Sequence, residues 1–275
     1  MYKIIIGDSL NGFTVRDYFI LKQYSVSQIK RFKYNGEIKV NGIPVTVRYR
    51  MKTGDVLELS TENRLLTPQF APDAAKLLYC DKYLYLAEKP YGIPTHPDKA
   101  NVNGTLGNML AATFGDGFCL RIITRLDKTT SGIVLGALDE ITAEKLNRQQ
   151  QNRLIRKIYR AEVVGVMKND NGTIQLPLLR RDAENKTVVD DKGKYAETEY
   201  EVVERRQTTT IVKLYPHTGR THQLRAHMSA AGHPIVGDVL YGAAKDERIK
   251  LHCERLSFTH PYEQKTVDYC LPCDF

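Results

Sequence analysis

Three segments of this 275-residue chain carry side chains whose types and spacing could do chemistry. The first holds Asp127 in a turn-rich loop between two apolar runs, with Arg125 and Lys128 close by. A carboxylate on a loop fed by a rigid strand is well placed for catalysis, but Asp is also common in turns, where it accepts backbone hydrogen bonds. From the residues alone, a turn or capping role for Asp127 is favoured over catalysis.

The other two segments supply a phenol and a guanidinium. The pattern of residues 156–165 predicts a strand on which Tyr159 alternates with apolar residues, a position more typical of the core than of catalysis. Further along, Thr218 is a candidate N-cap for a helix that Gly232 ends. Arg225 lies midway along that predicted helix and can offer a bidentate contact to a carboxylate or a phosphate.

The histidines around this helix suggest metal chemistry as an alternative. The four candidates are His217, His222, His227 and His233. His222 and His227 are five residues apart, about 500° around a helix of about 3.6 residues per turn, so they do not share a face. Cys270 and Cys273 form a C-x-x-C without a second pair, which indicates packing more than zinc binding. We therefore expect no metal.

The net charge of +8, from 40 basic and 32 acidic residues, is concentrated near the N-terminus. Residues 12–52 contain nine Lys or Arg and two Asp or Glu, a net charge of +7, whereas residues 53–275 contribute only +1. A basic module on a near-neutral body indicates docking to a polyanion, although a charge run alone is more often a solvated face.

The pattern within this module predicts a helix, a second helix, a hairpin and a strand. The second helix ends at Asn35-Gly36 and carries Lys30, Arg31 and Lys33 near the following turn, where each phosphate contact strengthens sequence-independent binding. After Gly36 the apolar period switches to two, which is typical of strands, and Ile43–Val47 forms the second arm of the hairpin.

Residues 61–74, with two prolines and little periodicity, predict a linker between a domain of residues 1–60 and a domain of residues 75–275. In the larger domain, six strand patterns outnumber three helical ones, at 104–114, 141–150 and 220–230. An α+β fold follows, with a mixed, mainly antiparallel sheet flanked by helices. Neither G-x-G-x-x-G nor a P-loop motif is present, so we expect no nucleotide cofactor.

Composition indicates the compartment. The chain is 42% hydrophobic and 26% charged, which is typical of a globular protein. No stretch approaches the roughly 20 apolar residues of a membrane helix, and the first residues lack the apolar core of a signal peptide. Five scattered cysteines fit reduced thiols. We expect a soluble, cytoplasmic protein with no membrane partner.

Longer motifs resemble two known families. Residues 27–42 and 47–57 resemble an S4 RNA-binding domain. From Leu77 to the C-terminus the chain resembles the RluA family of RNA pseudouridine synthases. The motifs are Arg-Leu-Asp-x-x-Thr-Ser-Gly from Arg125, Lys-x-Tyr-x-Ala-x-Val-x-Gly from Lys157, and Thr-Gly-Arg-Thr-His-Gln-Leu-Arg-x-His from Thr218. The family usually has His before Arg-Leu-Asp, where this chain has Thr124.

The resemblance implies isomerisation of uridine to pseudouridine, a rearrangement that requires no metal or other cofactor. It implies that Asp127 is the catalytic aspartate and that Tyr159 is the active-site tyrosine. Arg225 becomes the candidate for a salt bridge to Asp127. Arg125 is then expected to help hold the target nucleotide out of its stack.

The resemblance also indicates the partner. Large-subunit ribosomal RNA of the 23S type, or its precursor, is the usual substrate of S4-bearing members, so we expect that RNA first and tRNA second, bound by a monomer. The main alternative is a non-catalytic RNA-binding or ribosome-assembly protein, against which the joint presence of Asp127, Tyr159 and Arg225 argues. A metal-dependent hydrolase is a third possibility, which metal analysis of the purified protein would test.

Overall fold

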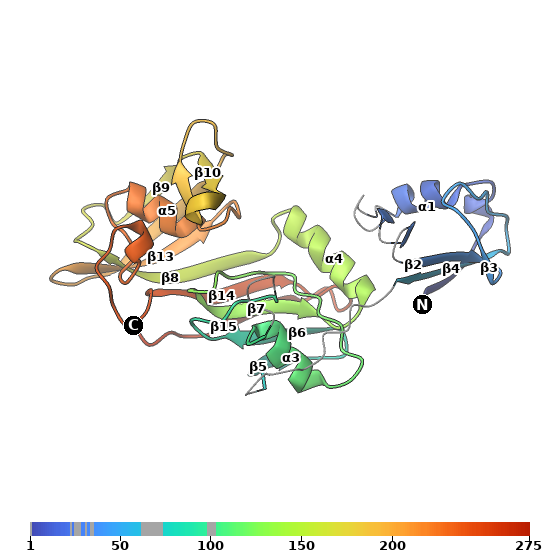
Figure 1. Ribbon diagram of the computed structural model, residues 1–275, viewed down its shortest axis with the longest axis horizontal. Helices are drawn as coiled ribbons and strands as arrows, with labels where there is room; N and C mark the ends of the chain where they lie inside the picture. Colours follow the sequence, from blue (N-terminus) through green and yellow to red (C-terminus); the bar gives the residue numbers. More distant parts are fainter. Residues whose placement is uncertain are drawn as a thin grey trace. The chain divides into compact units, whose positions relative to one another are not determined.

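The computed structural model describes residues 2–22, 24, 29–30, 32–33, 36–61, 74–97 and 103–275. The chain divides into two compact units, Met1–Arg64 and Leu65–Phe275 (Figure 1). This division falls inside the expected linker, of which residues 62–73 lie outside the described residues. In the described part of the chain, no helix has the length and apolarity that a membrane crossing requires.

The N-terminal unit is a four-stranded antiparallel sheet with strand order β1-β4-β2-β3 and one described helix, α1. Its elements are β1 (Tyr2–Ile5), η1 (Asp8–Leu10), α1 (Val15–Leu21), β2 (Gly36–Val40), β3 (Ile43–Pro44) and β4 (Val56–Thr61). Thr14 and Asp17 form a capping box that starts α1. In the core of this unit, the rings of Phe19 and Phe32 stack with their centroids 5.5 Å apart.

The first predicted helix is confirmed as α1, and the second is described only in part. Residues 29–30 and 32–33 are helical, whereas Arg31 lies outside the described residues together with 25–28 and 34–35. The predicted strand at 43–47 shortens to β3. Pro44 has no N–H group to donate, and β3 lies at the edge of the sheet, where a proline is tolerated.

The larger unit is built on a nine-stranded sheet with strand order β5-β6-β7-β14-β8-β13-β12-β9, and β15 also pairs with β14. The strands are β5 (Leu77–Cys80), β6 (Leu84–Lys89), β7 (Ser131–Ala137), β8 (Arg156–Val164), β9 (Asn171–Gln175), β12 (Glu197–Arg205), β13 (Thr209–Pro216), β14 (Leu251–Thr259) and β15 (Thr266–Cys270). β7 and β14 run parallel, and the other strand pairs described here are antiparallel. The prediction of a mixed, mainly antiparallel sheet is confirmed.

Helices cover both faces of the central strands. The three predicted helices are present as α3 (Leu106–Phe114), α4 (Glu140–Gln151) and α5 (Gln223–Ala230). Alternate residues of β6 point to opposite faces, so Tyr85 joins one core cluster with α3, while Leu84 and Leu86 join the other with α4 (Figure 1). Because both faces are buried, β7 is apolar or small throughout and lacks the alternation of a half-exposed strand.

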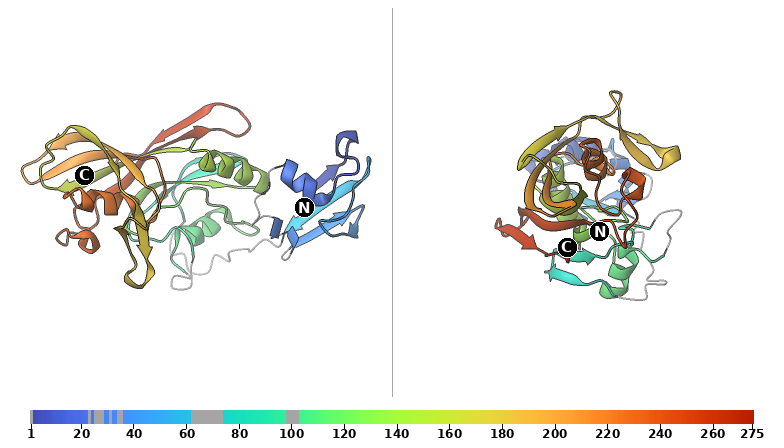
Figure 2. Two further views of the ribbon diagram at one scale, coloured as in Figure 1. Left: turned by 90° about the horizontal axis from the view of Figure 1, so that it is seen from above. Right: turned by 90° about the vertical axis from the view of Figure 1, so that its left-hand side faces the viewer.

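Two hairpins extend from this core. The β14–β15 hairpin projects as a red arm in the left view of Figure 2. A separate two-stranded sheet, β10 (Leu178–Arg181) with β11 (Lys186–Val189), is joined by the short helix η2 (Asp182–Glu184). The sequence analysis predicted neither this sheet nor β5 and β9, because these strands are four or five residues long and carry little alternation.

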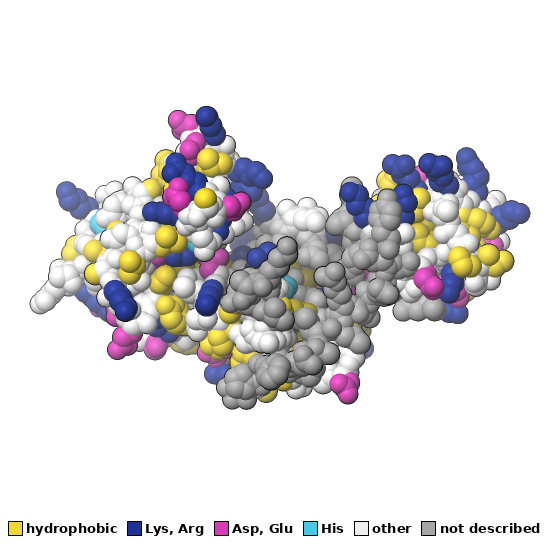
Figure 3. All heavy atoms as spheres, in the orientation of Figure 1, with side chains coloured by type: hydrophobic (Ala, Val, Ile, Leu, Met, Phe, Trp, Pro, Cys, Tyr) yellow, Lys and Arg dark blue, Asp and Glu magenta, His cyan; other side chains and the backbone are white. Residues whose placement is uncertain are grey.

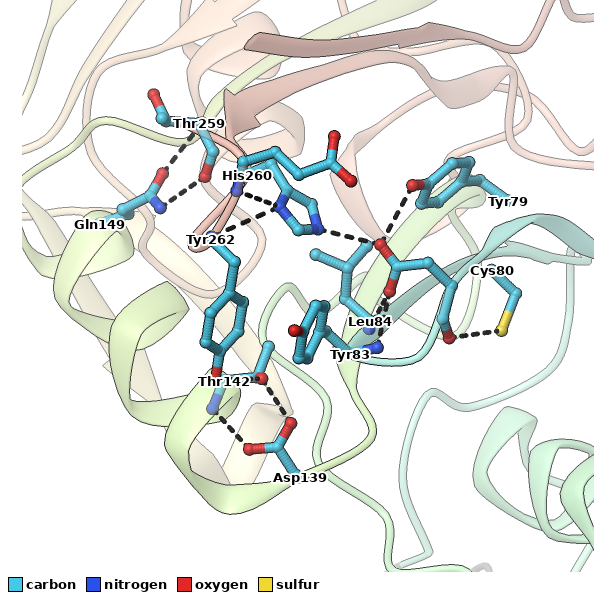
Figure 4. Close-up of polar contacts among 12 residues, drawn as sticks. Tyr79, Cys80, Tyr83, Leu84, Asp139, Thr142, Gln149, Thr259, His260 and Tyr262 are labelled. Carbon is cyan, nitrogen blue, oxygen red and sulfur yellow. Dashed lines mark hydrogen bonds and ion pairs between the residues drawn. The ribbon is translucent and has the colours of Figure 1, made fainter. Parts of the chain in front are cut away.

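A polar network ties the β5–β6 turn to the β14–β15 turn (Figure 4). Asp81 accepts hydrogen bonds from the backbone N–H groups of Tyr83 and Leu84 at 2.7 and 2.8 Å, and its Oδ2 lies 2.9 Å from His260 Nε2. The rings of Tyr83 and Tyr262 stack with their centroids 3.9 Å apart. Burial raises the pKa of Asp81, but the hydrogen-bond donors outweigh burial, so this pKa lies below its usual value.

Candidate active site

Asp127, Tyr159 and Arg225 line one cavity of about 310 Å³ in the larger unit. Asp127 lies in the loop that leads into β7, Tyr159 lies on β8, and Arg225 lies in the first turn of α5. β14 separates β7 from β8 in the sheet, and its Cys253 pairs with Tyr159. The fold therefore brings together three side chains that are distant in the sequence.

Hydrogen bonds at the two positions Thr124 and Leu126, just before Asp127, hold its loop in place. Thr95 Oγ1 donates to the carbonyl oxygen of Leu126 at 2.6 Å. Thr124, which stands where the resembling family usually has His, is buried and accepts a hydrogen bond from the N–H of Leu135 at 2.9 Å. Thr124 thus fixes the loop to β7 and does not line the cavity.

Lys89, at the end of β6, is fully buried beside the same loop. Its Nζ donates to the carbonyl oxygens of Pro90 at 2.8 Å, Ile93 at 2.7 Å and Lys128 at 3.2 Å. Burial lowers the pKa of Lys89 to about 7, whereas the nearby charge of Asp127 acts in the opposite direction. Lys89 is a positioning residue that the sequence analysis missed. The sequence gives little signal for its burial, because Lys89 follows Glu88 at the end of β6 and has the pattern of an exposed strand end.

Tyr159 presents a protonated phenol to the cavity. Its side chain is buried on β8, and burial raises its pKa well above the usual value, with further contributions from Cys253 and from the charge of Asp127. Cys253 is itself fully buried, and burial raises the pKa of its thiol to about 11. Near neutral pH the hydroxyl of Tyr159 therefore keeps its proton and can donate it.

The salt bridge that we expected between Arg225 and Asp127 is replaced by another. Arg225 Nε and Nη2 donate to Asp238 Oδ2 and Oδ1 at 2.6 and 2.7 Å, and no oxygen of Asp127 lies within 4.0 Å of the guanidinium nitrogens. The turn after α5 returns Asp238 to this position, and the two side chains are 6% and 0% exposed. Burial opposes the charge of Arg225, but Asp238 outweighs burial and raises the pKa of Arg225.

The start of α5 also differs from the prediction. The helix begins at Gln223 after His222, which adopts a left-handed conformation with φ 53°. Thr218 is not the N-cap, because its hydroxyl accepts a hydrogen bond from the N–H of Glu197 at 2.9 Å and donates to Gln223 Oε1 at 2.8 Å. As a result, Arg225 lies at the start of the helix and not midway along it.

His222 lines the cavity, although the sequence analysis considered it only as a metal ligand. Its Nδ1 lies 3.1 Å from the hydroxyl of Tyr241, which donates its own proton to the carbonyl oxygen of Thr187 at 3.0 Å. The contact with Tyr241 holds the imidazole of His222 at the wall of the cavity. Burial lowers the pKa of His222, and the charge of Asp127 acts in the opposite direction.

The remaining predicted residues lie elsewhere on the chain or at the edge of the cavity. Arg125 is exposed and contributes to the cavity lining. Lys30 and Lys33 are exposed in the N-terminal unit. Cys270 is exposed on β15, and Cys273 is half-buried. Within the described ranges, no group of three or more His, Cys, Asp or Glu side chains could hold a metal ion.

Comparison with known proteins identifies the family. The model of the family described as RNA pseudouridylate synthase matches residues 83–230, which include Asp127, Tyr159 and Arg225. The chain belongs to this RNA pseudouridine synthase family. It is therefore an isomerase that acts on uridine in RNA.

Relatives and a solved structure agree with this assignment. The chain is 37% identical over 205 residues to the dual-specificity RNA pseudouridine synthase RluA of Vibrio cholerae, covering 72% of this chain and 83% of the relative. It is 34% identical over 277 residues to ribosomal large subunit pseudouridine synthase D of Neisseria meningitidis, covering 92% and 73%. The structure of human RNA pseudouridylate synthase domain containing 1 is similar with a TM-score of 0.64 at 27% identity, covering 75% of this chain and 86% of that one.

Proposed function

We propose that this pseudouridine synthase isomerises specific uridines of large-subunit ribosomal RNA and that Asp127 is its essential carboxylate. The observation that carries the proposal is the convergence of Asp127, Tyr159 and Arg225 on one cavity of about 310 Å³. Ligand-binding pockets typically have volumes of ~300–1,000 Å³, so this one has room for a single nucleotide.

The reaction defines what the residues must do. The bond between N1 of uracil and C1′ of the sugar breaks, the base turns, and C5 bonds to C1′ in its place. N1 gains a proton, and C5 loses one, so the reaction has no net redox change and imports no group. Asp127 acts on the sugar as a nucleophile or as a base. Arg225, which stays charged beside Asp238, lies near the carboxylate of Asp127 and attracts it, and Lys89, with a pKa of about 7, adds to this attraction only while it is protonated.

Tyr159 acts on the uracil, whereas Asp127 acts on the sugar. Its buried ring forms part of the cavity wall, where it can stack on uracil, and its raised pKa keeps a proton on the hydroxyl. The proton that C5 loses needs an acceptor, and the hydroxyl of Tyr159 can take it up while passing its own proton on, a transfer typically worth ~10²–10⁴-fold in rate. Arg125 is exposed at the cavity and can contact the backbone of the flipped nucleotide, whose unstacking costs a few kcal/mol.

Two observations support large-subunit ribosomal RNA as the target and an S4-like role for the N-terminal unit. The alignment with the Neisseria meningitidis large-subunit enzyme covers 92% of this chain, which is more than Leu65–Phe275 alone, so it extends into the N-terminal unit. Lys and Arg side chains gather along one edge of this unit (Figure 3). Neutralising Lys30, Arg31 and Lys33 should weaken RNA binding and flatten its salt dependence.

We further propose that the active form is a monomer and that it acts on its RNA in the cytoplasm.

Release of tritium from RNA labelled at C5 of uridine tests the proposal. The C5–H bond is lost in the reaction, so the wild-type protein should release tritium from total ribosomal RNA of cells that lack it. Asp127→Asn should release none while it binds the same RNA with an affinity within about twofold of wild type. Asp116→Asn is the matched control, because Asp116 is exposed and lies outside the cavity. Full release by Asp127→Asn would refute the role of Asp127.

A further inference from the structure

A second cavity of about 770 Å³ adjoins the first. It lies between the end of α4, the start of β8, the end of β13 and the β14–β15 hairpin. The two cavities share lining residues, which are Gln150, Lys157, Pro216, Thr218, Gly219 and Arg220. We propose that this second cavity holds the RNA strand as it leaves the uridine cavity, with the nucleotide next to the target seated in it.

This proposal rests on the proposed function, because it starts from a polymeric substrate. The target uridine stays linked to both neighbouring nucleotides when it is flipped, so the strand must cross the rim of the uridine cavity on its way in and out. A single small anion would need one charged pocket. An RNA strand needs adjoining pockets with positive charge along them, and the shared wall supplies that continuity.

The charges of the second cavity suit phosphates. Of its two carboxylates, Asp268 is bound by Arg255, and Glu199 lies 3.2 Å from the ring of His217. Three further arginines line the cavity or its shared wall, namely Arg153, Arg156 and Arg220. Within the described part of the chain, none of these three has a carboxylate oxygen within 4.0 Å. Guanidinium groups stay charged at any physiological pH, and the four arginines of the lining outnumber its two carboxylates, so this surface carries a net positive charge.

The same cavity offers a surface for a base. Tyr215 is half-buried in its wall, and its hydroxyl donates to Glu201 at 2.8 Å, which fixes the ring. Pro216 and Ile158 add apolar surface beside it. Aromatic rings next to cations are the usual elements of single-stranded RNA binding, because any base can stack on such a ring.

The backbone conformation at Arg153 allows a substitution that keeps the fold. Arg153 follows α4 in a left-handed conformation with φ 57°. Asn adopts this conformation more readily than Arg does. Arg153→Asn therefore removes a charge without adding backbone strain, so we expect this variant to stay folded. Arg156→Gln removes the second charge from an exposed position at the start of β8.

Equilibrium binding of fluorescein-labelled dodecauridylate to the full chain, at several salt concentrations, tests the proposal. Each lost phosphate contact lowers the slope of log K against log salt by about 0.7 for a single strand. The Arg153→Asn/Arg156→Gln variant should lose about 1.4 in slope and about 25-fold in affinity near 0.1 M salt. Lys168→Gln is the control, because Lys168 is an exposed cation outside both cavities, and its affinity should stay within about twofold of wild type.

The outcomes separate this inference from the proposed function. If the double variant binds like the control while the wild type releases tritium from RNA, the strand path is wrong and the proposed function stands. If the double variant loses affinity but the wild type releases no tritium, the proposed function fails and the cavity remains an RNA-binding surface. A weakening of affinity by Lys168→Gln equal to that of the double variant would also overturn the inference, since the effect would then be one of net charge.

Discussion

Replacement of Asp238 by Asn tests whether Arg225 depends on its buried partner. The change keeps the size of the side chain and removes the negative charge that Arg225 Nε and Nη2 bind at 2.6 and 2.7 Å. Because the two side chains are 6% and 0% exposed, solvent screens the remaining charge poorly. Breaking a buried ion pair by removing one partner costs ~3–5 kcal/mol. At ~2–4 °C per kcal/mol for a unit of this size, the Tm should fall by about 6–20 °C.

The assay is thermal and urea unfolding of the full chain, followed by circular dichroism. Asp268→Asn is the matched control, because Asp268 also binds an arginine through two oxygens, but its side chain and that of Arg255 are 38% and 50% exposed. An exposed pair contributes about 1 kcal/mol or less. The variant Arg225→Met/Asp238→Leu should regain most of the lost stability, because apolar replacement of a buried pair is often neutral.

The reasoning would be refuted if Asp238→Asn destabilised the protein no more than Asp268→Asn does. That result would mean that Arg225 tolerates the loss of its partner, either by moving to Asp127 or by reaching solvent. Tritium release distinguishes these cases, since a guanidinium that moves onto Asp127 would lower the rate without lowering the Tm.

Three further predictions concern single side chains. Tyr159→Phe should keep RNA affinity but slow tritium release by about 10²-fold, because the ring remains and the hydroxyl that takes up the C5 proton is lost. An unchanged rate would show that this hydroxyl has no part in proton transfer. Lys89→Met should lower the unfolding free energy by ~1–3 kcal/mol and slow release at least tenfold, since three buried carbonyls lose their donor; equal rates would show that the loop positions Asp127 unaided. Because the pKa of Asp81 is lowered in the folded protein, its carboxylate stabilises the fold at neutral pH, and this effect is lost as pH falls below about 4. Asp81→Asn should therefore make the free energy of unfolding fall less steeply with pH in the acid range than it does in the wild type. The same pH dependence in both proteins would contradict this.

The sequence pattern predicted the strands and loops that carry the site residues better than it predicted the contacts of those residues. Alternation around Tyr159 predicted β8, and a loop between apolar runs predicted the position of Asp127, because both depend on residues close in sequence. The predicted partner of Arg225, Asp127, was wrong. The actual partner depends on how the chain turns back after α5 to bring Asp238 against the first turn of this helix. Such a pairing is set by tertiary packing, which periodicity does not encode.

Two other residues show the same limit. Thr218 has the right residue type for an N-cap, but its hydroxyl binds the N–H of Glu197 on a neighbouring strand. A lysine at the end of a strand is usually exposed to solvent. Lys89 is buried because the neighbouring loops supply three carbonyl oxygens that accept hydrogen bonds from its Nζ. In both cases a long-range hydrogen bond outweighs the local preference, and only the folded chain shows it.

The most direct test of the central claim is a map of pseudouridines in ribosomal and transfer RNA from cells that lack this protein. The map would be repeated after complementation with the wild type or with Asp127→Asn. The account predicts that at least one site in large-subunit ribosomal RNA is lost in the deletion, returns with the wild type and does not return with Asp127→Asn. Unchanged maps in the deletion, or full restoration by Asp127→Asn, would contradict it.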